Sequence, residues 1–154
     1  MEINYRDCFG NDLKLKPRVE LYSIQDFLGR PMPGLAVVFD TVGENDGDIE
    51  EEYGVLTVSF GEMIGLKDCA FIDSNNFQDA DQFLKQGIAF DTGLTRRSGF
   101  CTYPLWQFNG AFLKECGGDN YREYSDAYNR YFGLDDNDPP QAPAEQNACQ
   151  ITME

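Results

Sequence analysis

Tyr53-Gly54-Val55-Leu56-Thr57-Val58-Ser59-Phe60 is the strongest strand signal in the chain, because it combines β-branched and aromatic residues within one short run. Upstream, Leu35–Phe39 is a short apolar run typical of a more buried strand. Residues 18–24 alternate polar and apolar side chains, as a half-buried strand does. Short links join the three segments, which predicts an antiparallel meander, since parallel strands need a long crossover.

The rest of the chain supplies further strands and helices. Strands are expected at 69–73 and 100–108, where Pro104 suits an edge position. Helices are expected at 77–86 with Asn76 as the N-cap, at 109–116 ending at Gly117-Gly118, and at 120–132. Residues 1–17 are expected to form an irregular arm, and residues 88–100 to hold a glycine-containing turn, Asp91-Thr92-Gly93, and a basic pair, Arg96-Arg97.

These elements together predict an α+β fold. A mostly antiparallel sheet of about five strands would carry two or three helices on one face. Residues 1–133 are expected to form a single domain, and the polar, proline-containing residues 134–154 a disordered acidic tail. Four tyrosines line one face of the last helix, which favours packing of that face on the sheet, namely Tyr121, Tyr124, Tyr128 and Tyr131.

The charge distribution is strongly uneven. The chain has 27 acidic residues, 12 basic residues and no histidine, for a net charge of −15. No basic residue occurs between Arg30 and Lys67. Such a field repels nucleic acid and anionic lipid and attracts basic protein surfaces. The acidic residues of that interval are Asp40, Glu44, Asp46, Asp48, Glu50, Glu51, Glu52 and Glu62.

Two interpretations of this acidic segment stay open. It is either a solvated loop that keeps the protein soluble or a surface that imitates the charge density of nucleic acid. No apolar run is long enough to span a membrane and no signal peptide is visible, so a cytoplasmic protein is expected.

Signals for catalysis and for bound metals are weak. Without histidine the commonest general base is missing, and Asp73 or Asp91 has no evident catalytic partner, so an enzyme is not expected. The five cysteines include no C-x-x-C pair, which predicts free thiols rather than zinc ligands or a disulfide framework. No cofactor and no metal are expected.

A second candidate site lies in the loops between residues 73 and 108. Its polar residues would line a small anionic pocket if the loops meet; otherwise Asp73 would form an ion pair with one arginine and fix the loop geometry. The residues concerned are Asp73, Asn75, Asn76, Arg96, Arg97 and Ser98.

From Thr57 to Phe108 the chain resembles a known family. The matching stretches are Thr57–Phe60, Ala70–Asn76, Gly87–Ala89 with Thr92-Gly93, and Ser98–Phe108. The family consists of small acidic proteins known only as a domain of unknown function, frequent on conjugative elements and phage-like islands of gut bacteria. Ser74 stands where the family usually has threonine, and Trp106 where tyrosine is common.

The resemblance implies a setting on mobile DNA, where genes often disarm host defences. Together with the charge, it favours an inhibitory binding protein of anti-CRISPR or anti-restriction type that occupies the basic nucleic-acid groove of a nuclease or restriction enzyme. We expect no direct nucleic-acid or membrane partner and a monomer or homodimer. The alternatives are a small-molecule or peptide-binding module built on the 73–108 loops, a conjugation accessory protein, and an enzyme using Asp73 or Asp91.

Overall fold

The computed structural model describes residues 1–43 and 49–133 as two antiparallel sheets rather than one. Sheet A has the strand order β1-β2-β3-β4, and sheet B has the order β5-β6-β8-β7. The strands of sheet A are β1 (Ile3–Arg6), β2 (Asp12–Gln25), β3 (Pro31–Val42) and β4 (Ile49–Val55). Those of sheet B are β5 (Thr57–Val58), β6 (Cys69–Ile72), β7 (Ala89–Ser98) and β8 (Cys101–Phe108). The expected tail, 134–154, lies outside the described residues.

The prediction of a single sheet of about five strands is therefore wrong in detail, although the α+β class and the antiparallel pairing are confirmed. The strand predicted at 53–60 divides at Leu56, which is fully buried between the sheets. The Leu56 N–H donates to the Val37 carbonyl at 2.9 Å, and the Leu56 carbonyl accepts from the Asp73 N–H at 2.8 Å. One residue thus carries the chain from sheet A into sheet B.

Two strands were not predicted. The N-terminal segment, expected to be irregular, forms β1 and the start of β2, with Ile3 opposite Leu15. The segment 88–100, expected to hold a turn at Asp91-Thr92-Gly93, forms β7. Its pairing with β8 shifts register between Asp91 and Thr95, so a bulge around Gly93 conceals the alternation of a strand.

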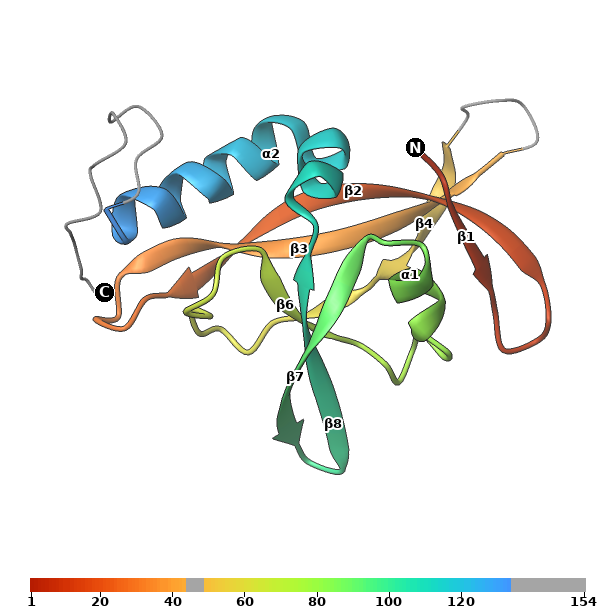
Figure 1. Ribbon diagram of the computed structural model, residues 1–154, viewed down its shortest axis with the longest axis horizontal. Coiled ribbons are helices and arrows are strands. Elements are labelled where there is room, and N and C mark those ends of the chain that lie inside the picture. Colours follow the sequence, from red (N-terminus) through yellow and green to blue (C-terminus); the bar gives the residue numbers. More distant parts are fainter. Residues whose placement is uncertain (44–48, 134–154) are drawn as a thin grey trace.

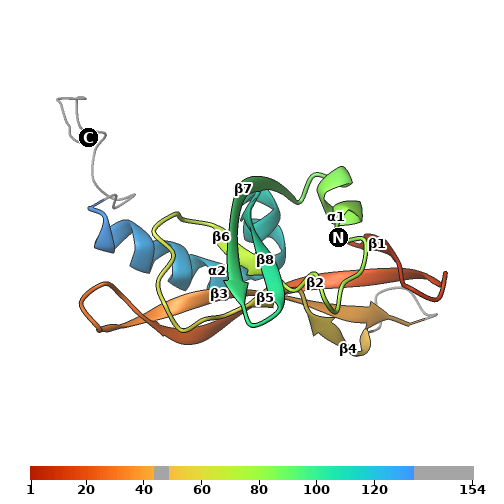
Figure 2. The same cartoon turned by 90° about the horizontal axis from the view of Figure 1, so that it is seen from below.

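The helices lie with sheet B on one side of sheet A (Figures 1 and 2). Helix α1 (Asp81–Lys85) is shorter than the predicted helix at 77–86, because the Asp73 side chain holds a turn through the Asn76 N–H and Asp79 adopts a φ of 53°. Helix α2 (Gly110–Tyr131) joins the two helices predicted at 109–116 and 120–132, with a kink at Gly118. The predicted break at Gly117-Gly118 therefore survives as this kink.

The core fills the space between these layers, and the tyrosine face of α2 belongs to it. Tyr121, Tyr124 and Tyr128 are buried, as their spacing predicts. The Tyr124 hydroxyl accepts from the Asp68 N–H at 2.8 Å, and the Tyr128 hydroxyl donates to the Ile64 carbonyl at 2.8 Å. Burial raises the pKa of Tyr124 well above its ordinary value. These three tyrosines therefore stabilise the fold and are not free to form an interface.

Two features of the outer surface matter for function. The β7–β8 hairpin projects from the body of the molecule (Figure 1), and we call its residues 92–104 the arm. On the face of sheet A that carries Arg18, residues 58–64 lie near Tyr22 at one end, and we call the remainder of this face, around Arg18, the open face. Within the described residues, no helix is both long and apolar enough to span a membrane.

Candidate interaction surface

The acidic residues of sheet A gather around one arginine on the open face. Arg18 of β2 donates from Nε to the Asp40 carboxylate and from a terminal nitrogen to Glu52, each at 2.9 Å. It also forms an ion pair with Glu20. The antiparallel register explains the cluster, since Asp40 of β3 lies opposite Glu52 of β4 and diagonally across from Arg18.

Members of this cluster differ in access to solvent. The Asp40 side chain is only 7% exposed, whereas Glu20 and Glu52 are 50% and 54% exposed. Arg18 forms ion pairs with three carboxylates, and Lys16 lies directly opposite Asp40 on the same face and offsets part of the remaining negative charge. Asp40 therefore anchors Arg18 inside the fold, and Glu20 and Glu52 are the groups a partner can reach. Sequence reasoning missed Arg18 and Glu20, because only the strand register brings them to the acidic segment.

The other predicted acidic residues are distributed differently. Glu51 is exposed, and side-chain alternation places it on the opposite side of β4 from Glu52. Its backbone N–H and carbonyl both pair with the Thr41 hydroxyl at 3.2 Å. The acidic segment is thus partly strand rather than a continuous loop, because β4 begins at Ile49. Glu44, Asp46, Asp48 and the side chain of Glu50 lie outside the described residues.

Glu62 does not join this surface. It bridges to Gln25, which pairs with Pro31, nine residues before Asp40 on β3. At roughly 3.3 Å per residue, Glu62 lies about 30 Å from Asp40. Its carboxylate instead accepts from Arg96 of β7 at 3.1 Å.

The structure brings part of the predicted pocket of the 73–108 loops together around Tyr103, which lies opposite Arg96, and leaves Arg97 and Ser98 apart. The Asp73 carboxylate accepts from the Asn76 side chain at 2.7 Å, and the Asn75 amide lies 3.5 Å from the Tyr103 hydroxyl. Arg96 and Arg97 are consecutive on β7, so their side chains point to opposite faces. Ser98 is exposed at the end of β7. The alternative of an ion pair between Asp73 and an arginine is also absent from the described residues.

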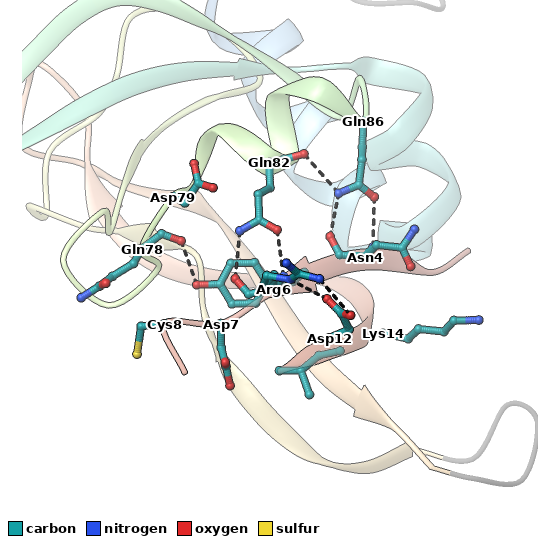
Figure 3. Close-up of a pocket in the computed structure, with 12 residues that line it drawn as sticks. Asn4, Arg6, Asp7, Cys8, Asp12, Lys14, Gln78, Asp79, Gln82 and Gln86 are labelled. Atoms are coloured by element: carbon teal, nitrogen blue, oxygen red, sulfur yellow. Dashed lines mark hydrogen bonds and ion pairs between the residues drawn. The ribbon is translucent and has the colours of Figure 1, made fainter. Parts of the chain in front are cut away.

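A cavity of about 830 Å³ lies elsewhere, between β1, the β1–β2 turn and α1 (Figure 3). One wall is a pair of glutamines that close the outer edge of β1. Gln86 accepts from the Asn4 N–H at 3.0 Å and donates to the Asn4 carbonyl at 2.7 Å. Gln82 makes the same pair of bonds to Arg6, at 2.8 and 2.9 Å. We call Gln82 and Gln86 the glutamine clip.

Spacing explains why the clip fits. Four residues of helix rise about 6 Å, and two residues of strand span about 6.8 Å, so side chains at i and i+4 of a helix can follow alternate residues of a strand. The signal was present in the sequence as two glutamines four apart, but the strand they serve lies 76 or more positions away. Sequence inspection alone did not connect them.

Polar groups around this cavity are already engaged with one another. Arg6 donates to both oxygens of Asp12, at 2.9 and 3.2 Å, and this hydrogen bond lowers the pKa of Asp12. The Asn11 backbone N–H donates to Asp7 and lowers the pKa of that carboxyl. Burial raises the pKa of Tyr5 to about 12, and the Tyr5 hydroxyl donates to the Gln78 carbonyl. The cavity wall is therefore built mainly to hold β1 and its turn.

The fold and the surface define a small α+β protein whose open sheet face carries the Arg18 cluster. Residues 32–128 match the family described as a domain of unknown function (DUF4313), and the chain belongs to this family. No curated protein and no solved structure is significantly similar to the chain. Membership of an uncharacterised family, expected from the resemblance of residues 57–108, is confirmed, and the association with mobile DNA becomes part of the proposal that follows.

Proposed function

We propose that this protein binds another protein on a basic surface that normally holds nucleic acid. The observation that carries the proposal is the Arg18 cluster, in which Glu20 and Glu52 stay exposed although one arginine contacts both. The net charge of −15 adds a long-range attraction to basic surfaces. Lysines and arginines that hold phosphate can pair with carboxylates through the same charge-assisted hydrogen bonds.

Electrostatic docking of this kind acts mainly on the rate of association. Exposed ion pairs contribute little to affinity one by one, but a complementary field steers encounter and is screened by salt. The open face suits this role because it is a sheet surface held in shape by Arg18 and Asp40. The binding groups therefore need no ordering when the partner arrives.

The finer part of the proposal concerns the partner. We assign it to a nuclease or restriction enzyme of host defence, inhibited because its groove is occupied. This choice is supported by the family resemblance and its setting on mobile DNA, an argument by association. A partner in conjugation would use the same electrostatics and differ only in the identity of the protein bound.

The test is a pull-down from bacterial lysate at about 0.05 M and about 0.5 M salt, followed by assay of the bound protein for nucleic-acid binding. The wild type is compared with a Glu20→Lys/Glu52→Lys double variant. A Glu115→Lys/Glu123→Lys variant on the exposed surface of α2 is the control, because it changes the net charge equally. Asp40 is left intact because its carboxylate is part of the fold.

We expect a basic nucleic-acid-binding protein that is released by salt, is retained by the control variant and is lost with the Glu20→Lys/Glu52→Lys variant. Added DNA or RNA should compete with binding. If the open-face variant retained its partner as well as the control did, the open face would not be the binding surface, and the proposal would be wrong.

A further inference from the structure

The arm contrasts in charge with the rest of the chain. Residues 92–114 contain no acidic residue, although they include Arg96, Arg97 and Lys114. No other acid-free stretch in the sequence is as long. The field of this protein is therefore least negative at the arm, and a like-charged molecule meets the least repulsion there.

The outer edge of the arm offers unpaired main-chain groups. β7 is the outermost strand of sheet B, and Ser98 faces Cys101 across a two-residue turn. Ser98 and Arg96 therefore direct their backbone groups toward β8, and Thr95 and Arg97 direct theirs outward. Within the described part of the chain, no hydrogen bond satisfies the outward groups of Thr95 or Arg97.

Apolar side chains accompany this edge. Phe100 is fully exposed at the tip of the arm, and Leu94 is 55% exposed in the bulge. Gly99, with a φ of 62°, occupies the first central position of the turn, which is the geometry of a type II′ hairpin. The Phe100 side chain is not buried by the fold in this position, and exposed aromatic residues are effective interface anchors.

The arm is held in place at its middle and at its base. Arg96 pairs with Glu62 and lies 4.2 Å above the Phe60 ring. Tyr103 contacts the same ring at 5.6 Å between centroids. The Thr92 hydroxyl donates to the Leu105 carbonyl at 2.8 Å across the bulge. The arm is therefore ordered in advance, which reduces the entropy lost on association.

We propose that the arm is a dimerisation surface, on which the β7 edge of a second copy of this chain pairs antiparallel with β7. A two-fold axis brings the same surface from both chains together, so each copy would contribute its acid-free segment. The projection of the arm keeps the two acidic bodies apart (Figure 1). Pairing would satisfy the outward groups of Thr95 and Arg97 and bury Phe100 and Leu94. The proposal does not depend on the proposed function.

The test is the mass of the purified protein in solution, measured by analytical ultracentrifugation up to about 300 µM, where even a weak dimer is populated. We expect the mass to rise from 17.4 kDa toward twice that value. Because the two copies are like-charged, dimerisation should strengthen between about 0.05 M and about 0.5 M salt. Binding through the open face should weaken over the same range, so the two proposals can fail separately.

Two variants test the surface itself. Phe100→Ser removes the apolar tip, and Thr95→Pro removes an outward N–H without breaking a bond to β8. Each should weaken the dimer by roughly tenfold or more. Phe9→Ser is the control, because Phe9 is also highly exposed but lies on the β1–β2 turn. Phe100→Ser should leave the unfolding midpoint of the dilute monomer unchanged.

A protein that stays at 17.4 kDa at the highest concentration would overturn the proposal. So would a dimer that both arm variants leave intact, because association would then use another surface. A dimer weakened by Phe9→Ser and not by Phe100→Ser would place the interface on the β1–β2 turn instead.

Discussion

The two sheets differ in whether the main-chain groups of their outer strands are hydrogen-bonded. In sheet A, the edge of β1 is closed by the glutamine clip, whose two side chains pair with the main chain of Asn4 and Arg6. In sheet B, the outward groups of Thr95 and Arg97 on β7 have no such partner in the residues described. The chain can thus close an edge with a five-residue helix, so an open edge is not an unavoidable result of its fold.

The two sheets also differ in the side-chain contacts that hold their strands and turns. In sheet A, Arg18 of β2 forms ion pairs with residues of β3 and β4, and Asp26 holds the β2–β3 turn by hydrogen bonds. The arm has a glycine and an exposed phenylalanine at the corresponding place. Sheet A is stabilised by contacts along its length, whereas the arm is held at its middle and base and leaves Phe100 exposed at its tip. The following changes test this difference, beginning with the largest expected effect.

Arg18→Ala should destabilise the protein by about 2–3 kcal/mol, because it leaves the buried Asp40 carboxylate unpaired beside Glu52. The loss is smaller than for a fully buried pair because the Arg18 side chain is one-third exposed. Urea unfolding measures the effect. Arg122→Ala on α2 is the control, since Arg122 is exposed and forms an ion pair with the exposed Asp119 at 3.5 Å. Equal effects of the two variants would show that the Arg18 cluster does not stabilise sheet A.

Asp26→Asn should cost about 1–2 kcal/mol at neutral pH. Burial alone would raise the pKa of Asp26, but hydrogen bonds from the Arg30 and Leu28 N–H groups and from the Arg30 guanidinium outweigh it and lower the pKa. A carboxyl whose pKa is lowered by folding contributes stability above its unfolded pKa of about 3.9.

That contribution should disappear as the pH falls through the folded pKa of Asp26. Unfolding curves of wild type and Asp26→Asn, recorded from neutral pH down to a pH below the folded pKa of Asp26, should therefore converge at the acid end. Asp126→Asn, at an exposed position of α2, should track the wild type throughout. If the difference in free energy of unfolding between wild type and Asp26→Asn stayed constant with pH, the charge of Asp26 would not stabilise the turn.

Gln82→Ala/Gln86→Ala should cost about 1 kcal/mol, because the exposed edge groups of Asn4 and Arg6 can turn to water. Alanine favours helix, so the loss cannot come from helix propensity. Amide hydrogen exchange at Asn4 and Arg6 should become as fast as at Thr95 and Arg97 in dilute wild type. Lys85→Ala in the same helix should leave that exchange slow, and unchanged exchange in the glutamine variant would contradict the clip.

Sequence patterns predicted the parts of the fold that depend on local chemistry. The tyrosines of α2 are buried because a spacing of three and four residues places them on one helical face. The helix is kinked at Gly118, whose φ of 53° is a conformation that glycine adopts without strain. The strand at 53–60 was located, but its division at Leu56 was not. That division depends on hydrogen bonds to Val37 and Asp73, which no local pattern reveals.

The candidate surface was predicted only in part for the same reason. The acidic segment is visible in composition, but Asp40 is buried because Arg18, 22 residues earlier, reaches it through strand register. Glu62 is close to Asp40 in sequence and distant in space, since the chain has already left sheet A at Leu56. β7 escaped notice because its bulge interrupts the alternation on which strand prediction relies.

Leu56 also has a mechanical consequence. Because its N–H and carbonyl are bonded to opposite sheets, a load applied at the tip of the arm passes through this residue into the centre of β3. This link limits how far the arm can reorient relative to the open face, so two arms joined in a dimer would restrict the angle between their two open faces. A partner with a single groove would then meet one face at a time, whereas a symmetric partner could engage both at a set spacing.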